Sequence, residues 1–223
     1  MSNISFTVDD GGTPNLQDSE PFVFTVTPFN DPPVMNAIGA QSTNEDTQKV
    51  VSITISDIDD ALNCATSLSV TTNNAGLVPI GNVAFTGGTS IAGGSVICTA
   101  TITPVADANG SVDLTFITSD TGIPIKTDTE VVTLSVSAVN DAPILAAIGA
   151  QSTNEDTAKA VSVTISDVDN ALNCTTALSV TTNNAGLVPI ANVVFTGGSS
   201  VAGGSVVCTA TITPVADANG SVN

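Results

Sequence analysis

The stretch "VVTLSVSAV", residues 131–139, decides the fold, because apolar and polar residues alternate along it. Val132, Leu134, Val136 and Ala138 share one face, as in a β-strand that is buried on one side. Shorter stretches with the same period of two recur along the chain, and no stretch has the 3.6-residue period of an amphipathic helix. The sequence therefore predicts an all-β protein.

The chain repeats itself. Residues 33–113 and 143–223 align without a gap at an offset of 110 and are identical at 65 of 81 positions. Residues 1–32 align with residues 111–142 at the same offset, with nine identities in 32 positions. We therefore expect the chain to hold one complete repeat and two partial repeats.

Alternation predicts seven short strands in the complete repeat, which is typical of an immunoglobulin-like sandwich. The predicted fold is thus a series of seven-stranded immunoglobulin- or cadherin-like β-sandwich units in tandem. The expected strands are residues 37–40, 49–55, 66–72, 83–86, 96–103, 112–118 and 131–139. Residues 33–142 then form a complete sandwich, residues 1–32 the last two strands of a split sandwich, and residues 143–223 the first five strands of one.

The composition limits the function. The chain has 21 Asp and Glu residues against three Lys residues and no His, and its net charge is −18. This charge repels nucleic acid and anionic lipid and attracts cations. No apolar run approaches the roughly 20 residues that span a bilayer. Without His, Arg or Tyr the chain lacks most catalytic side chains, so we expect no enzyme, no nucleic-acid partner and no membrane insertion.

Three segments carry a family resemblance. "AVNDAPILAAIGAQSTNEDT" (138–157), "ISDVDN" (165–170) and "TATITPVADANGSV" (209–222) resemble the tandem cadherin-like and immunoglobulin-like repeats of very large bacterial surface proteins, whose units join at "VNDAP". The resemblance covers essentially the whole chain. It implies an extracellular or cell-surface location, tandem arrays, an adhesive or scaffolding role and, often, bound calcium. The cysteines are not part of that family pattern.

Each repeat contains two cysteines, and we expect them to form the disulfides Cys64–Cys98 and Cys174–Cys208. In an up-and-down sandwich the third and fifth strands begin at the same pole, so each bridge is geometrically possible. Such bridges imply an oxidising compartment. The alternative is two small buried thiols in each unit.

Acidic loops are expected to meet where two units join and to bind calcium there, because calcium takes six to eight oxygen ligands. The alternative is that Asp and Asn serve only as turn formers. The expected ligands at the junction inside the chain are Glu45, Asp46, Asp107, Asn140, Asp141, Asp167 and Asp169. A second junction would join Asn30, Asp31, Asp57 and Asp59 to Glu155 and Asp217 of a neighbouring copy.

The split sandwich predicts self-association. Residues 143–223 lack two core strands, and residues 1–32 hold such a pair. The two ends of the complete unit lie about 35–40 Å apart, too far for the pair to fold back within one chain. We therefore expect the pair to enter the open sandwich of another copy, in a head-to-tail filament. The alternative is that the chain is an excerpt of a long covalent surface adhesin whose sandwich units bind carbohydrate or protein partners.

Overall fold

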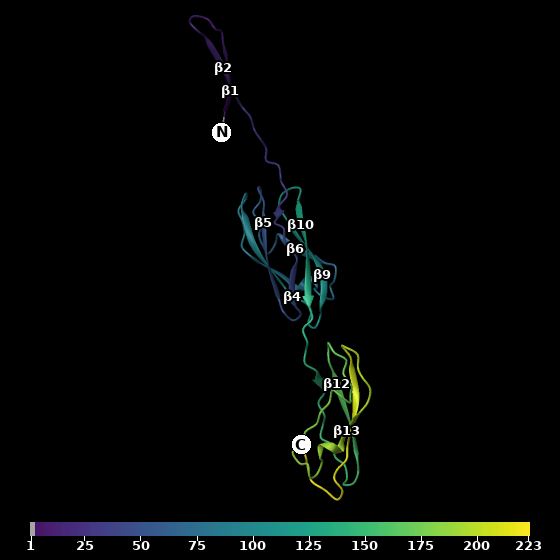
Figure 1. Cartoon of the computed structure of the whole chain (residues 1–223). Helices are drawn as coiled ribbons and strands as arrows, with labels where there is room; N and C mark the ends of the chain where they lie inside the picture. Colours follow the sequence, from purple (N-terminus) through teal and green to yellow (C-terminus); the bar gives the residue numbers. More distant parts are fainter. Residues whose placement is uncertain (1–2) are drawn as a thin grey trace. The chain divides into compact units, whose positions relative to one another are not determined.

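The structure is a computed structural model that describes residues 3–223, and Figure 1 shows that β-strands dominate it. The N-terminal strands are β1 (Asn3–Asp9) and β2 (Gln17–Val23). The next eight are β3 (Val34–Met35), β4 (Gln41–Asn44), β5 (Lys49–Ser56), β6 (Leu68–Thr72), β7 (Val83–Gly87), β8 (Ser95–Ile102), β9 (Gly110–Ser119) and β10 (Thr127–Ser137). The last four are β11 (Ile144–Leu145), β12 (Lys159–Ser166), β13 (Val193–Thr196) and β14 (Ser205–Ile212).

The complete repeat forms a β-sandwich. One sheet has the strand order β3-β5-β8-β7 and the other has the order β4-β10-β9-β6. Alternate residues of each strand point inward, so that Ile53 of β5, Phe116 of β9 and Leu134 of β10 are all fully buried. These two packed sheets confirm the predicted β-sandwich. It forms because alternation with a period of two gives each sheet one apolar face to bury.

The first predicted strand, residues 37–40, is wrong. The structure places β3 before this stretch and β4 after it, and residues 36–40 belong to neither strand. β3 pairs with β5, whereas β4 lies next to β10 in the opposite sheet. The stretch is therefore where the first strand of the sandwich crosses from one sheet to the other. If β3 and β4 are counted as one interrupted strand, the sandwich has seven.

Residues 143–223 form only one of the two sheets, with the order β11-β12-β14-β13. Residues 151–154 and 178–182 align with β4 and β6 at the offset of 110, yet they form no strand. In the complete sandwich β4 and β6 pair with β10 and β9, and the described part of this repeat contains no counterpart of that pair. A strand segment without a neighbour has no ladder of hydrogen bonds to hold it extended.

Side chains along this open side lose their cover. Met35 is 6% exposed in the complete sandwich, whereas the aligned Leu145 is 58% exposed. Ile38 is 9% exposed, and the aligned Ile148 is 46% exposed. The remaining core is a cluster formed by Val161, Val163, Ile165, Cys174, Cys208 and Ala210.

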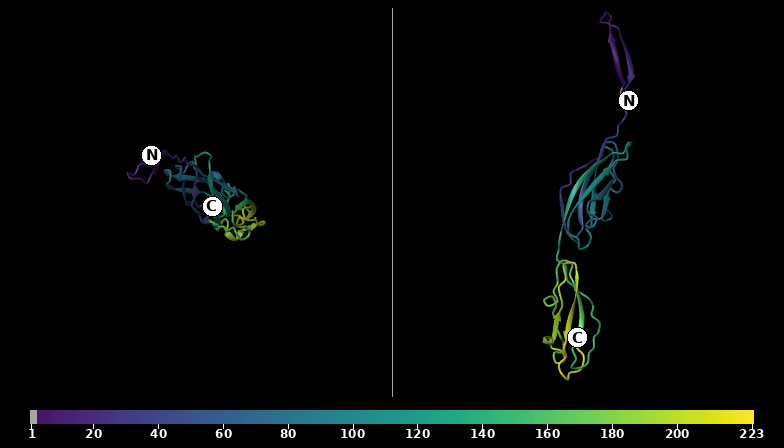
Figure 2. Two further views of the ribbon diagram at one scale, coloured as in Figure 1. Left: turned by 90° about the horizontal axis from the view of Figure 1, so that it is seen from above. Right: turned by 90° about the vertical axis from the view of Figure 1, so that its right-hand side faces the viewer.

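Strands β1 and β2 form an antiparallel hairpin, which Figure 2 shows from two further directions. The rings of Phe6 and Phe22 stack with their centroids 5.3 Å apart. Phe6 is nevertheless 70% exposed, while Phe116, which aligns with it at the offset of 110, is fully buried. The hairpin thus has the pattern of two core strands but has no core around it.

Both predicted disulfides, Cys64–Cys98 and Cys174–Cys208, are present, each with Cα atoms 5.4 Å apart. A glycine lies against each bridge. Gly87 has a φ of +141°, and a Cβ atom at this position would lie 2.6 Å from the Sγ atom of Cys64. Gly197 has the same role at Cys174.

None of the described residues forms a helix with the length and apolar character to cross a bilayer.

Candidate metal centre

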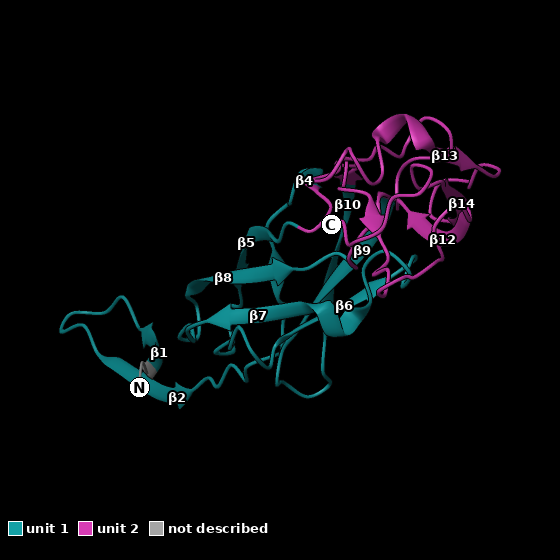
Figure 3. Cartoon of the chain, turned by 90° about the horizontal axis from the view of Figure 1, so that it is seen from below, with its two compact units in different colours: residues 1–43, 47–104, 111–135 teal, residues 44–46, 105–110, 136–223 magenta. Residues whose placement is uncertain are grey.

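Five carboxylates gather within one compact unit of the chain, drawn in magenta in Figure 3. We call them the linker cluster: Glu45, Asp46, Asp107, Asp141 and Asp169. Oxygens of Glu45, Asp141 and Asp169 lie within 4.8 Å of one another, and so do oxygens of Asp46, Asp107 and Asp141. All five were predicted as ligands, and the structure brings them together.

The backbone conformation of the loops and their hydrogen bonds hold these side chains in place. Asp46 and Asp107 both have a φ of +57°, in the left-handed region that Asp tolerates better than most residues. The Asp107 N–H donates to Oδ1 of Asp46 over 3.2 Å, which joins the loop after β4 to the loop after β8. The Asp141 N–H donates to Oδ2 of Asp169 over 2.6 Å. Each loop is therefore fixed by a neighbouring carboxylate of the same cluster.

Glu45 is the most buried member of the linker cluster, since it is only 2% exposed. Its Oε1 atom accepts a hydrogen bond from the Val139 N–H, and its Oε2 atom accepts one from the side-chain amide of Asn109 over 3.3 Å. The Glu45 N–H donates to the carbonyl of Ser137 over 2.9 Å. A buried carboxylate with fixed neighbours is a preformed ligand.

Asp141 is shared by both groups of three carboxylates in the linker cluster. Its partial burial raises the pKa of its carboxyl group, and so do the charges of Asp169, Asp107, Asp46 and Glu45, in that order. Its Oδ2 atom is buried and has no hydrogen-bond partner among the described residues. A hollow of about 300 Å³ opens beside Asp107 and Asp141. A cation there would remove the repulsion and fill the empty position on Oδ2.

The other two predicted ligands, Asp167 and Asn140, lie beside the linker cluster, and metal binding by them remains a prediction. Asp167 lines the hollow, and its Oδ1 atom accepts the N–H groups of Asp169 and Asn170 over 2.9 and 2.7 Å, which closes their turn. Asn140 accepts a hydrogen bond from the side chain of Asn170 over 2.8 Å. These two residues therefore shape the loops around the linker cluster.

The second predicted junction would form between two copies of the chain. The structure of one chain shows each half of this junction separately. On one side the Asp31 N–H donates to Oδ2 of Asp59 over 2.8 Å, which matches the bond between Asp141 and Asp169. On the other side the Asp217 N–H donates to Oδ1 of Asp156 over 2.9 Å, as Asp107 does to Asp46. Glu155 is exposed, unlike the aligned Glu45. The meeting of these halves remains a prediction.

A second cluster joins Asp57 with two carboxylates that sequence reasoning missed, Asp60 and Asp120. Asp57 is 3% exposed and Asp120 is 5% exposed, and the Oδ2 atoms of Asp57 and Asp60 are buried without a partner among the described residues. The side-chain amide of Asn30 donates to Oδ2 of Asp120 over 2.8 Å. The sequence does indicate that Asp120 lies near Asp57, because Asp120 aligns with Asp10 and lies in the loop after β9, at the same pole of the sandwich as Asp57.

Both clusters offer only hard oxygen ligands. The chain has no His, and the structure shows no free Cys among the described residues. Carboxylates with carbonyl groups and water suit calcium or magnesium and not zinc or copper. Calcium tolerates the irregular geometry of ligands from several loops, whereas magnesium demands a near-ideal octahedron. Calcium therefore fits this donor set best.

Replacing Asp141 with asparagine is expected to have opposite effects with and without calcium. With calcium, affinity should fall by about tenfold or more, because a shared carboxylate is lost. Without calcium, the variant should unfold at a higher temperature than the wild type, because four like charges lose their repulsive partner.

The difference in stability between the calcium-free wild type and the Asp141→Asn variant should depend on pH. The folded-state pKa of Asp141 is raised, so the folded wild type takes up this proton before the unfolded chain does. Calcium-free wild type should therefore gain stability relative to the Asp141→Asn variant as the pH falls through the raised pKa. Calorimetric titration and thermal unfolding measure both effects, with Asp113→Asn, outside both clusters, as the control. Unchanged calcium affinity of the Asp141→Asn variant would contradict the assignment.

No protein-family model matches the chain, and no curated protein matches it. Among solved structures, the protocadherin γB4 extracellular domain is 18% identical with a TM-score of 0.40, covering 99% of this chain and 35% of that one. The protocadherin γB7 EC3-6 cis-dimer structure is 17% identical with a TM-score of 0.38, covering 99% and 52%. The eight N-terminal Ig domains of DSCAM are 9% identical with a TM-score of 0.27, covering 92% and 41%.

The chain spans about a third to a half of the length of these three structures. At such low TM-scores and identities, the function of the chain must be argued from its own residues.

Proposed function

We propose that this protein is a non-catalytic structural component of the cell exterior, a fibre or adhesin stalk. Copies would assemble head-to-tail by strand complementation, and calcium would stiffen the junctions. The observation that carries the proposal is the match between an exposed apolar hairpin and an open sandwich within the same chain. The two disulfides support an oxidising, extracellular location.

The hairpin has the surface of a strand donor. Its apolar side chains alternate with polar ones, and they align at the offset of 110 with residues that are at most 4% exposed in the complete sandwich. In β1, β2 and residues 24–26, which follow β2 directly, the same positions are 38–78% exposed. The aligned pairs are Ile4 with Leu114, Phe6 with Phe116, Val8 with Thr118, Phe22 with Val132, Phe24 with Leu134 and Val26 with Val136. Exposed apolar surface on this scale favours association.

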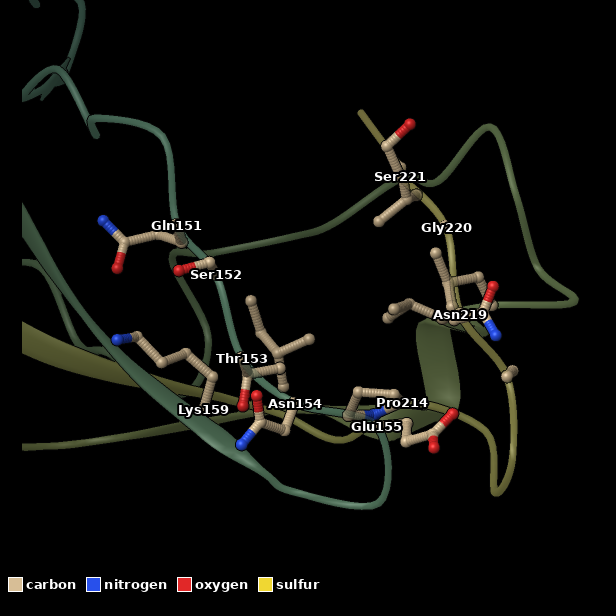
Figure 4. Close-up of a pocket in the computed structure, with 15 residues that line it drawn as sticks. Gln151, Ser152, Thr153, Asn154, Glu155, Lys159, Pro214, Asn219, Gly220 and Ser221 are labelled. Atoms are coloured by element: carbon tan, nitrogen blue, oxygen red, sulfur yellow. The ribbon is translucent and has the colours of Figure 1, made fainter.

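The acceptor is the open side of residues 143–223. Figure 4 shows a hollow there, between the segment that carries Gln151–Glu155 and the segment that carries Asn219–Ser221. Its volume is about 480 Å³, and Leu187, Val188 and Ile212 give it an apolar lining. Ile212 is partly exposed, whereas the aligned Ile102 of the complete sandwich is fully buried. In the complete sandwich β9 and β10 supply the missing cover.

The geometry of the contact determines the form of the assembly. Donor and acceptor are different surfaces, so the contact is heterologous and leaves a free donor at one end and a free acceptor at the other. Such a contact gives an open filament unless its rotation closes a ring. Calcium at the linker cluster, and at the predicted junction of Asn30, Asp31, Asp57 and Asp59 with Glu155 and Asp217, would fix the angle between successive sandwiches.

Sedimentation velocity over a range of concentrations, combined with electron microscopy, tests the proposal. We expect the sedimentation coefficient to rise with concentration and the images to show filaments. A calcium chelator should leave the filaments assembled but more bent, because strand pairing needs no metal while the junctions do. A chain that stays monomeric at millimolar concentration, with and without calcium, would overturn assembly between copies.

A second candidate is the stalk of a long covalent surface adhesin, whose units could bind carbohydrate or protein partners. The complete repeat favours it, because β9 follows β8 directly in the same chain and closes the sandwich without a second copy. Under this candidate the open side of residues 143–223 is closed by strands of the same polypeptide. The two candidates differ in the sedimentation experiment, since only the first requires association of the 223-residue chain.

A further inference from the structure

Two carboxylates on the inward face of β10 bind the backbone of the first strand. Oδ2 of Asp128 accepts the Met35 N–H over 2.8 Å, and Oε1 of Glu130 accepts the Ile38 N–H over 3.1 Å. Both side chains are partly buried and continue the row of alternate residues that holds Val132. Acidic residues thus stand where the alternation of β10 would otherwise place apolar ones.

The need for these carboxylates arises where the first strand changes sheets. Met35 ends β3, and residues 36–40 lie between β3 and β4. The Asn36 N–H still donates to the Thr54 carbonyl, but the Met35 and Ile38 N–H groups need acceptors outside this ladder. Met35 and Ile38 are almost completely buried, which removes water as an acceptor. A hydrogen bond to an ionised carboxylate is stronger than one to a neutral acceptor. Asp128 and Glu130 therefore fix where β10 lies along the first strand.

The same two residues occur in the hairpin. Asp18 and Glu20 align with Asp128 and Glu130 at the offset of 110, and they precede Phe22 on the same face of β2. Both are exposed in the hairpin. In the described part of the hairpin, Asp9 and Asp10 accept the side-chain hydrogen bonds, and neither Asp18 nor Glu20 accepts one.

The matching backbone is present on the open sandwich. Leu145 and Ile148 align with Met35 and Ile38, and both are largely exposed. The Ala146 N–H donates to the Thr164 carbonyl over 2.9 Å, as the Asn36 N–H donates to Thr54 over 3.0 Å. Because the neighbouring ladder bond is conserved between the two repeats, the Leu145 N–H points away from β12 as the Met35 N–H points away from β5.

We infer that Asp18 and Glu20 of one copy bind the backbone N–H groups of Leu145 and Ile148 in the next copy and so set the register of assembly. The inference rests on the proposed strand complementation and adds the residues that make it specific.

Apolar alternation alone cannot set this register. A slip of one residue would turn the apolar face of β2 outward, and alternation forbids it. A slip of two residues keeps Phe22, Phe24 and Val26 facing inward, so alternation permits it. That slip would also separate both carboxylates from their amides and bury charge without a partner. The acidic pair thus acts against the wrong register while it stabilises the right one.

Single and double variants of the full chain test the inference. Asp18→Ala with Glu20→Ala should weaken association in sedimentation by about tenfold or more, since two charge-assisted hydrogen bonds are lost. Asp18→Asn with Glu20→Gln should recover part of the loss, because an amide oxygen still accepts a hydrogen bond. Ser19→Ala, on the opposite face of β2, is the matched control and should associate like the wild type.

Hydrogen exchange locates the two contacts individually. Assembly of the wild type should protect the amides of Leu145 and Ile148, Asp18→Ala should lose protection at Leu145, and Glu20→Ala should lose it at Ile148. If the wild type assembles while the double alanine variant associates equally well and keeps both amides protected, the inference is overturned and the assembly stands. If the wild type remains monomeric, the assembly and the inference are overturned together.

Discussion

Phe6→Asp is expected to leave the 223-residue chain monomeric at concentrations where the proposed strand complementation would assemble the wild type into filaments. Phe6 is 70% exposed in the hairpin, and the aligned Phe116 is fully buried and packs edge-to-face on Phe85 with ring centroids 6.0 Å apart. Complementation would place Phe6 in the same environment, against Phe195 of the acceptor. Deleting a buried phenylalanine costs about 3–5 kcal/mol, and an unpaired buried charge adds to this. Association should therefore weaken by about a thousandfold.

The matched control is Thr7→Asp, which places the same charge on the opposite face of β1. This residue aligns with Ile117, which is only partly buried, so the control should cost far less than Phe6→Asp. Sedimentation velocity compares the two variants with the wild type. Equal weakening by both would mean that added negative charge, and not the apolar face, controls association, and the strand-complementation model would then be wrong.

Removing the Cys64–Cys98 bridge should lower the free energy of unfolding of the complete sandwich by about 4 kcal/mol on the chain-entropy account. The bridge joins residues 34 apart in sequence and ties the loop before β6 to β8. Cys64→Ala with Cys98→Ala leaves small apolar side chains at two fully buried positions, so the loss of the cross-link should be the main change. Urea unfolding followed by circular dichroism measures the shift.

Reductant supplies the control for this variant. Wild type in reductant should unfold near the midpoint of the double variant, and adding reductant to the double variant should affect only the sandwich that keeps Cys174–Cys208. The same substitutions at Cys174 and Cys208 give the matched comparison in the other repeat. Identical unfolding of wild type and double variant, without reductant, would show that the bridge does not stabilise the complete sandwich.

Much of the fold could be predicted, because the alternation of apolar and polar residues, repeated in both units, indicates which side chains face inward. The five strands around Ile53, Phe85, Cys98, Phe116 and Leu134 lie close to their predicted bounds. The first strand could not be predicted, since residues 36–40 owe their path to contacts with two sheets and not to their own pattern. The loss of strand at residues 178–182 has a similar cause, because the sequence "LSVTT" forms β6 when β9 lies beside it and no strand without it.

Part of the candidate metal centre could also be predicted from the sequence, and part could not. Glu45, Asp46, Asp107, Asp141 and Asp169 could be predicted as neighbours because strand direction assigns each loop to a pole of the sandwich. Asp60 and Asp120 were not predicted because Asp60 lies outside the two-aspartate motif Asp57–Asp59 and Asp120 lies in the loop after β9, which has no acidic motif. Burial could not be predicted either. Only the folded structure shows that Glu45 is almost fully enclosed while the nearly identical segment around Glu155 leaves that residue exposed.

The disulfides also set how such a stalk would respond to pulling. A force applied along the chain draws out the residues before Cys64 and after Cys98, while the 34-residue span between them carries no tension as long as the bridge is intact. That span would measure about 120 Å when fully extended. Each sandwich that yields under load in an oxidising medium therefore releases about 120 Å less chain than its reduced form, and β6 and β7 are shielded from the force. In the proposed stalk, the bridge would therefore limit how much each unit lengthens under load.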